Sequence, residues 1–203
     1  MHLSRAAIDE MDHLYKINLM NSISGYKSAN LIATKSEDGI TNVAVFSSVV
    51  HYGSSPAILG FVLRPTTVAR NTYDNIKKTG FYTLNSISEN IIEDAHHTSA
   101  KYAPGISEFD KTDLSEEYKD GFYAPYVTES PLQIGMKFLE EYHIKANGTI
   151  LLLGEVTDLY FKDSMLSKDG FLNLAEAKIA AINGLDTYMV SEKYKRLSYQ
   201  RPK

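Results

Sequence analysis

Short apolar runs alternate with turn-forming residues along most of the chain, and this pattern predicts a fold built mainly from β-strands. Asp38-Gly39 separates the first two runs and Asn147-Gly148 the last two, and both dipeptides are typical of tight hairpin turns. Strands joined in hairpins favour a closed or nearly closed antiparallel barrel over a doubly wound parallel sheet. The predicted strands span residues 26–35, 41–50, 57–63, 81–85, 132–145 and 149–161.

Segments with helical spacing of apolar residues are interposed between these strands, and they predict peripheral helices. Ser4, Thr67 and Ser88 each precede such a segment, where a hydroxyl can accept a hydrogen bond from a free helix amide. Gly25 and Gly80 follow two of the segments and favour their ends. The predicted helices span residues 5–23, 68–78, 89–97 and 174–182.

Composition sets limits on the class of protein. The chain has 203 residues, of which 43% are hydrophobic, so we expect one domain over residues 1–203 with a genuine core. The absence of cysteine excludes disulfides and thiolate metal sites. A net charge of −4 argues against a nucleic-acid surface. No apolar run approaches the ~18 residues of a membrane span, and the first residues lack an apolar signal core, so we expect a soluble, cytoplasmic protein.

Several common sites are missing from the sequence. It contains no GxGxxG dinucleotide fingerprint, no P-loop and no GxSxG nucleophile elbow. His96 and His97 are adjacent, so their side chains point in different directions on either a helix or a strand. Metal ligands converge on one point, and we therefore predict no metal site.

Hydroxyl groups gather after the apolar run Val43–Phe46, and an arginine with two threonines follows the next apolar run, Ala57–Leu63. Arg64 offers a planar fork suited to phosphate, and Thr66 and Thr67 add hydroxyl donors. Thr67 can also begin a helix whose free amides face an anion, with Thr72 one turn further on. The alternative is a hydroxyl-capped turn with Arg64 in a surface ion pair. Spacing alone leaves both interpretations open.

The ordered set of segments resembles the flavin reductase family, whose members fold as an FMN-binding split β-barrel. The matching segments are "GYKSANLIATKSEDGITNVAVFSSVVHYGSSPAILGFVLRP", "TTVARNTYDNIKKTGFYTLN", "AHHTSAKY", "SEF", "PLQIGMKF", "NGTILLLGEV" and "INGLDTY". The resemblance implies a mainly β, antiparallel Greek-key split barrel with peripheral helices. It also implies FMN as cofactor.

The resemblance carries a set of cofactor-binding residues onto this chain. Residues 44–48 are expected along the flavin ring and ribityl chain, partly through backbone groups, and the Arg-Pro-Thr-Thr turn is expected at the phosphate. Lys101 is expected either near the flavin N1 or phosphate, or as a solvated lysine, and His51 either faces the substrate or is an ordinary loop histidine. The full set is Ala44, Val45, Phe46, Ser47, Ser48, His51, Arg64, Thr66, Thr67, Thr72, Asn85, Thr98, Ser99 and Lys101.

No catalytic residue is assigned. Many family members carry a Gly-Asp-His motif in a late barrel strand, whereas this chain reads Ala146-Asn147-Gly148-Thr149 at the comparable hairpin. Hydride transfer from a nicotinamide to a flavin requires no general base, so the missing histidine does not exclude that chemistry.

Three functions agree with the resemblance to different degrees. The first is an NAD(P)H-dependent flavin reductase that supplies reduced FMN to a partner such as a monooxygenase, and the second is an FMN electron carrier of the flavoredoxin type, served by a redox protein. A split-barrel relative with another ligand, such as haem, is the third, but the sequence shows no signature for one.

The resemblance also implies a homodimer, in which the acidic segment 104–130 and the basic tail 193–203 either contact the partner or remain solvated.

Overall fold

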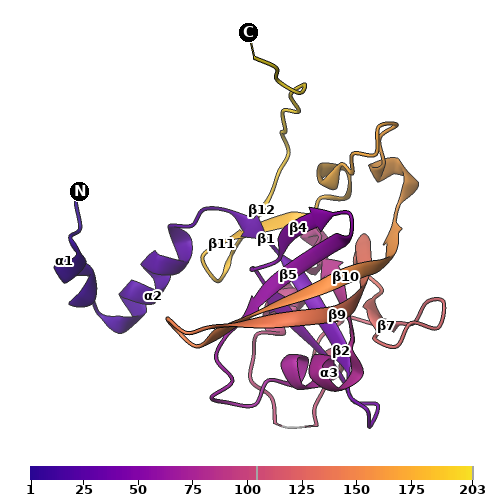
Figure 1. Cartoon of the computed structure of the whole chain (residues 1–203), viewed down its shortest axis with the longest axis horizontal. Coiled ribbons are helices and arrows are strands. Elements are labelled where there is room, and N and C mark those ends of the chain that lie inside the picture. The colour runs from indigo at the N-terminus through magenta and orange to yellow at the C-terminus, as the bar shows by residue number, and fades with distance from the viewer. Residues whose placement is uncertain (104, 203) are drawn as a thin grey trace.

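The computed structural model describes residues 1–103 and 105–202 of the chain. Pro104, which opens the predicted acidic segment, and Lys203, which ends the basic tail, lie outside the described residues. Strands form the body of the molecule and the helices lie around it (Figure 1). The strands are β1 (Lys27–Ser28), β2 (Asn30–Lys35), β3 (Thr41–Phe46), β4 (Val50–Ser54), β5 (Ala57–Leu63), β6 (Phe81–Ser86), β7 (Glu116–Glu117), β8 (Tyr126–Val127), β9 (Leu132–Ile144), β10 (Thr149–Phe161), β11 (Ala180–Asn183) and β12 (Thr187–Val190).

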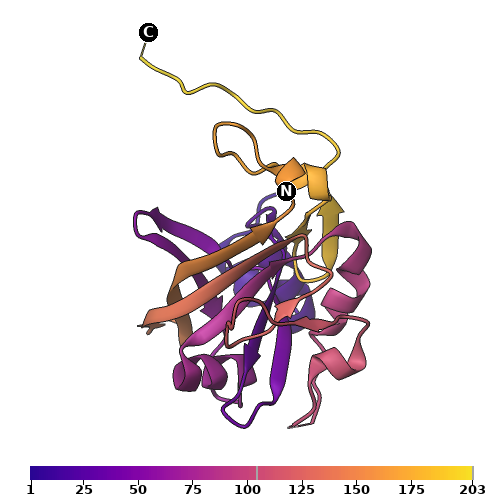
Figure 2. The same cartoon turned by 90° about the vertical axis from the view of Figure 1, so that its right-hand side faces the viewer.

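The helices are short. α4 and the 3-10 helix η2 lie together at one side of the sheet, away from α3 (Figure 2). The helices are α1 (Arg5–Asp9), α2 (His13–Ser22), α3 (Asn71–Thr79) and α4 (Ile92–His97), with the 3-10 helices η1 (Glu89–Ile91), η2 (Glu108–Lys111), η3 (Asp163–Met165) and η4 (Leu174–Ala177).

A seven-stranded antiparallel sheet in the order β3-β2-β6-β9-β10-β5-β4 forms the barrel. A three-stranded sheet, β1-β11-β12, and the two-stranded β7-β8 hairpin accompany it. This arrangement confirms the predicted mainly β, antiparallel split barrel with peripheral helices. In the described part of the chain, no helix is both long enough and apolar enough to cross a membrane.

Both predicted hairpin turns are confirmed. Gly39 has φ +87°, and the Ser36 N–H donates to the Ile40 carbonyl at 2.8 Å. Gly148 has φ +73°, and the Asn147 side chain accepts from the Thr149 N–H at 3.1 Å. Glycine adopts this left-handed conformation without a Cβ clash, which is why these turns can be read from sequence.

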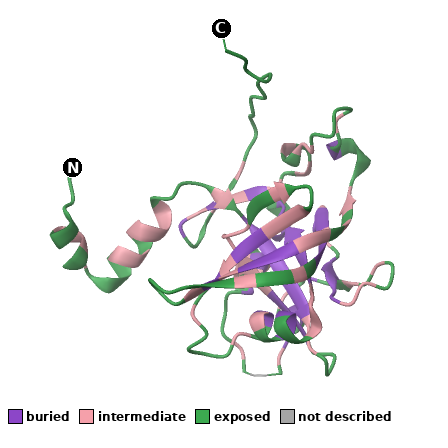
Figure 3. Cartoon of the chain, viewed as in Figure 1, coloured by how far each residue is buried: buried purple, intermediate pink, exposed green. Residues whose placement is uncertain are grey.

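The core lies on both faces of β2, which is buried along most of its length (Figure 3). Leu31 and Ala33 belong to one apolar cluster, which α4 and η2 cover, whereas Ile32 belongs to a second cluster inside the barrel. Because side chains alternate along a strand, this central strand joins the two clusters. Burial on both faces also explains why Leu31, Ile32 and Ala33 are apolar without alternation.

The barrel closes between β3 and β5 without a strand ladder. Beyond the end of β3, the Ser48 hydroxyl accepts from the Val62 N–H at 3.1 Å and donates to the Val62 carbonyl at 3.0 Å. Next to this contact, the rings of Phe46 and Phe61 meet edge to face with centroids 5.2 Å apart. One side chain therefore satisfies the N–H and the carbonyl of Val62, which a neighbouring strand would otherwise pair.

The single helix predicted over residues 5–23 is wrong, because two helices form there. Ser4 caps α1 as predicted, but Asp12 accepts from the amides of Leu14 and Tyr15 and so begins a second helix. Neither helix has a buried residue, and together they extend away from the barrel (Figures 1 and 3). We call residues 1–23 the N-terminal arm.

Two boundaries near the predicted cofactor residues also differ. The strand predicted over 41–50 ends at Phe46, and residues 50–54 form β4, which pairs with β5. The helix predicted to start after Thr67 begins only at Asn71, with Arg70 at the N-cap, so Thr67 is not a helix cap. Ser88 stands at the N-cap position before η1, but within the described residues its hydroxyl makes no capping hydrogen bond, and the helix predicted over 89–97 is divided into η1 and α4. Gly80 ends α3 with φ +78°, as predicted.

The helix predicted over 174–182 is largely wrong. Only Leu174–Ala177 forms a helical turn, and Lys178 then adopts φ +50°. Residues from Ala180 onward pair with β1 and β12 with alternating burial. Tertiary pairing thus overrides the helix propensity of this alanine-rich segment. The described part of the acidic segment, residues 105–130, is mostly loop with the short elements η2, β7 and β8.

Gly154 leaves room for the buried ring of Tyr82. A Cβ at this position would overlap the Tyr82 hydroxyl and lie 3.1 Å from the Lys137 carbonyl oxygen. We expect Gly154→Ala to destabilise the fold by about 1–3 kcal/mol, because a packed core resists overpacking. Urea unfolding measures the change.

The matched control is Tyr82→Phe. Among the described residues the Tyr82 hydroxyl has no hydrogen-bond partner, so its removal should be close to neutral. Gly154→Ala should therefore cost less unfolding free energy in the Tyr82→Phe background than in the wild-type background. An equal loss of unfolding free energy in both backgrounds would show that the contact with the Tyr82 hydroxyl does not cause the destabilisation.

Ser48→Ala should weaken the contact between the end of β3 and β5, because it leaves the N–H and the carbonyl of Val62 without their side-chain partner. We expect a loss of about 1–3 kcal/mol in unfolding free energy. Ser47→Ala, one residue earlier, provides the control and should change stability by less than about 0.5 kcal/mol. A wild-type midpoint in Ser48→Ala would contradict the closure described above.

Candidate functional site

The outer edge of β3 is the centre of the candidate site. β3 pairs only with β2, so its other edge faces no strand of the seven-stranded sheet. The Val43 N–H donates to Glu108 Oε2 at 3.0 Å on this edge. Because backbone groups alternate along a strand, the Val45 N–H points out from the same edge, beyond the cover that Glu108 gives.

Three other segments converge on β3 and fix its position. The Asn42 side-chain amide donates to the Thr72 hydroxyl at the start of α3, at 3.1 Å. The Thr41 hydroxyl lies 3.0 Å from that of Ser107, just before η2. On the face toward α4, Val45 packs against the first core cluster.

Residues 44–48 are all half-buried, which fits a surface that a planar ligand could cover. Two of their side chains are already engaged in closing the barrel. Phe46 contacts Phe61, and the Ser48 hydroxyl is committed to Val62. Because the Val45 side chain packs against the first core cluster, contacts from this stretch to a ligand fall mainly to backbone groups and to Ala44 and Ser47.

The predicted phosphate residues form an exposed loop between β5 and α3. Arg64, Thr66 and Thr67 are all exposed. Pro65 lies against Gly148, so the loop runs beside the β9–β10 turn. The structure thus presents these three side chains to solvent on one loop.

Arg70 ends the same loop, and sequence reasoning did not single it out. Its Nε atom is buried and has no acceptor among residues 1–103 and 105–202. The sequence signal is the second arginine of "RPTTVAR". The helix predicted over 68–78 placed Arg70 inside a helix, whereas α3 begins at Asn71 and leaves Arg70 in the loop. A buried donor without an acceptor is costly and fits a site for an anionic ligand.

Three predicted cofactor residues are buried parts of the scaffold. Thr72 bonds to Asn42, and the Thr98 hydroxyl donates to the Ala95 carbonyl at 2.7 Å. The Asn85 side chain has no exposed surface and accepts from the Val127 N–H at 3.0 Å. The structure does not bring these side chains to the open edge.

Ser99 and Lys101 are exposed just after α4, and His51 is exposed on β4, where it lies 3.3 Å from the Ser54 hydroxyl. β4 forms the opposite edge of the sheet from β3 in strand order. The predicted roles of these three residues remain predictions.

The adjacent histidines point apart. His96 Nδ1 lies 3.3 Å from the Tyr188 hydroxyl, whereas His97 Nε2 lies 2.6 Å from that of Tyr102. Within the described ranges, no group of three or more histidine or acidic side chains is placed to hold a metal ion.

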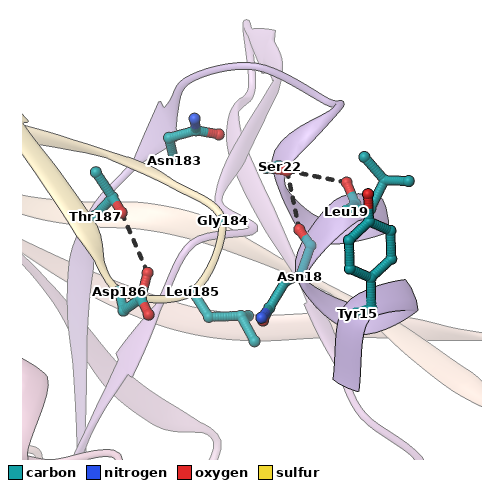
Figure 4. A pocket seen from close by; sticks show the side chains of 9 residues that line it. All are labelled: Tyr15, Asn18, Leu19, Ser22, Asn183, Gly184, Leu185, Asp186 and Thr187. Carbon is teal, nitrogen blue, oxygen red and sulfur yellow. Dashed lines mark hydrogen bonds between the residues drawn. The ribbon is translucent and has the colours of Figure 1, made fainter. Parts of the chain in front are cut away.

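Two open cavities lie elsewhere on the surface. One, of about 460 Å³, lies between α2 and the β11–β12 turn, where Asn18 and Leu185 face each other (Figure 4). The other, of about 560 Å³, lies between the β7–β8 hairpin and the end of β10. Neither of these two cavities is lined by a predicted cofactor residue.

Glu108, which is bonded to the β3 edge, has a raised pKa. Burial raises the pKa of its carboxyl group, and hydrogen bonds from the amides of Glu108 itself and of Val43 act in the opposite direction. The carboxylate is therefore held at an electrostatic cost beside the open part of the strand.

Comparison with solved structures places this architecture among flavin-handling proteins. A protein from Shewanella frigidimarina NCIMB 400, provisionally named a flavin reductase with split barrel domain, is 42% identical, with a TM-score of 0.95 over 98% of this chain and 100% of that one. Nitrilotriacetate monooxygenase component B from Bacillus cereus shares the fold at 15% identity, with a TM-score of 0.84 over 97% and 98% of the two chains. The flavoredoxin of Desulfovibrio vulgaris (Miyazaki F) does so at 20% identity, with a TM-score of 0.74 over 86% and 91%.

A family model gives the same answer from sequence. The model described as "Flavin reductase like domain" matches residues 24–181, which include the whole seven-stranded sheet and the loop that carries Arg64 and Arg70. The match covers well over half of the chain, and the chain therefore belongs to the flavin reductase-like family.

Proposed function

We propose that this chain binds FMN and acts as an oxidoreductase that passes hydride from NAD(P)H to the flavin. The observation that carries the proposal is that the strand with the open edge, β3, is bonded through Asn42 and Thr72 to the helix into which the two-arginine loop leads. A flavin nucleotide needs both parts, because it joins a planar ring with hydrogen-bonding edges to a phosphate.

The loop fits the phosphate. Arg64 supplies an exposed guanidinium, and Thr66 and Thr67 supply hydroxyl donors. Arg70 supplies a buried N–H that lacks an acceptor within the described residues. A phosphate oxygen would satisfy that donor, and charge-assisted bonds of this kind are among the strongest in proteins.

The β3 edge fits the ring. Half-buried residues from Ala44 to Ser48 offer a surface with outward backbone groups, and the lysine at position 101 is the proposed cation for the ring's N1 side. When bound, the flavin supplies a ring that accepts hydride from a reduced nicotinamide. The chain's part is to hold the ring in place with one face open to the nicotinamide.

We propose further that the working unit is a homodimer. Leu14, Tyr15 and Ile23 of the N-terminal arm are 69%, 59% and 66% exposed, and the arm has no buried residue in either helix. A ten-residue helix is marginal on its own, so this arm would gain stability by covering a second copy. The monooxygenase component among the structural relatives supports a partner that consumes reduced flavin.

An FMN electron carrier of the flavoredoxin type is the second candidate. The similarity in fold to a flavoredoxin supports it, and both functions need the same cradle for FMN. The carrier would take electrons from a redox protein and would not oxidise NADH or NADPH.

The visible spectrum of the chain separates the two functions. Protein incubated with FMN and desalted should retain flavin absorbance, and anaerobic NADH or NADPH should bleach it within seconds. Retained bands that persist with both nicotinamides would overturn the reductase and favour the carrier. Loss of all flavin on desalting, with no saturable binding in a titration, would overturn FMN binding itself.

Arg64→Ala should weaken FMN binding by about 1.5–3 kcal/mol, because it removes a charge-assisted contact to phosphate. Arg70→Ala should have an effect of similar size. Fluorescence titration gives the dissociation constants.

Arg196→Ala is the matched control. Arg196 is an exposed arginine of the basic tail, and its Nη2 atom lies 2.6 Å from Asp169 Oδ2. The substitution should leave FMN affinity unchanged. Wild-type affinity in both loop variants would contradict the phosphate assignment.

A further inference from the structure

The Ser107-Glu108-Phe109 segment has no role in the function proposed so far, although it touches the open strand directly. Glu108 is only 8% exposed, and its carboxylate accepts the Val43 N–H from the edge of β3. This contact is the last protein cover on that edge before Val45.

The main chain around Glu108 is anchored on both sides. Phe109 is buried in the first core cluster, and its N–H donates to the Ser107 hydroxyl. The Thr112 hydroxyl donates to the Glu108 carbonyl at 2.9 Å. Anchors before and after Glu108 therefore fix where its side chain meets β3.

A buried carboxylate is an unusual cover for a strand edge. Water or a neutral side chain could satisfy the Val43 amide, whereas burial of a charge costs free energy, as the raised pKa of Glu108 indicates. Charges kept at such a cost cluster at functional sites. The next outward amide, that of Val45, lies about 6.7 Å further along the strand.

We infer that Glu108 is a positioning residue for the flavin: by accepting the Val43 N–H it ends protein pairing along β3 and fixes the Val45 N–H as the donor that meets the ring. This inference rests on the proposed FMN binding. It predicts that the reach of the side chain matters more than its charge.

Two substitutions separate reach from charge. Glu108→Asp keeps the charge but shortens the side chain by one methylene, so it should lose the Val43 bond and raise the FMN dissociation constant about tenfold. Glu108→Gln keeps the length and one acceptor oxygen, so its constant should stay within about twofold of wild type. Asp110→Asn, at an exposed position of η2, controls for loss of charge and should not change binding.

Amide hydrogen exchange of the FMN-free protein provides the second readout. In Glu108→Asp the amides of Val43 and Val45 should exchange faster, whereas in Glu108→Gln they should exchange as in wild type. Circular dichroism confirms that each variant is folded.

Weakened binding in Glu108→Gln with normal binding in Glu108→Asp would overturn the inference in favour of a purely electrostatic role. Faster exchange in Glu108→Asp with unchanged FMN affinity would also overturn it, since the contact would then serve the scaffold alone. If the wild-type chain itself takes up no FMN, the proposed function fails, and the inference fails with it. Because that failure appears in wild type, it is distinguishable from failure of the inference alone.

Discussion

The closure of the barrel by a serine side chain is the constraint on which the rest of the structure depends. Ser48 bonds to both backbone groups of Val62, and Phe46 packs on Phe61 beside it. These contacts hold the end of β3 against β5, while in the seven-stranded sheet β3 pairs with β2 alone. The outer edge of β3 is therefore left for other groups, and the candidate site is built along it.

An open strand edge is a liability unless something covers it. In this chain Glu108 covers the edge at Val43, the start of α3 is fixed to β3 through Asn42 and Thr72, and the edge from Val45 onward is the part that we assign to flavin. The loop that carries Arg64 and Arg70 leads into α3, so the contact that fixes this helix to β3 also holds the end of the proposed phosphate site. The contacts that position β3 and α3 in the fold therefore also position the candidate site.

Local chemistry explains what could be predicted from sequence and what could not. The Asp38-Gly39 and Asn147-Gly148 hairpins were predictable because glycine at positive φ determines them within a few residues. The strand at 180–183 was missed because its pairing with β1 depends on residues over 150 positions away, which override an alanine-rich helical pattern. For the candidate site, the turn after Arg64 was predictable from Pro65, whereas the role of Arg64 at a phosphate stays a prediction. The burial of Asn85 and the Nε of Arg70, unpartnered among the described residues, depend on tertiary packing.

Hydrogen exchange measured by mass spectrometry, with and without FMN, tests the central claim most directly. The account predicts that FMN slows exchange in peptides covering residues 43–48 and 64–72, and leaves the linings of the two surface cavities unchanged. Protection confined to the cavity beside the N-terminal arm or to the one beside β7–β8 would place the ligand elsewhere. That result would contradict the assignment of the β3 edge.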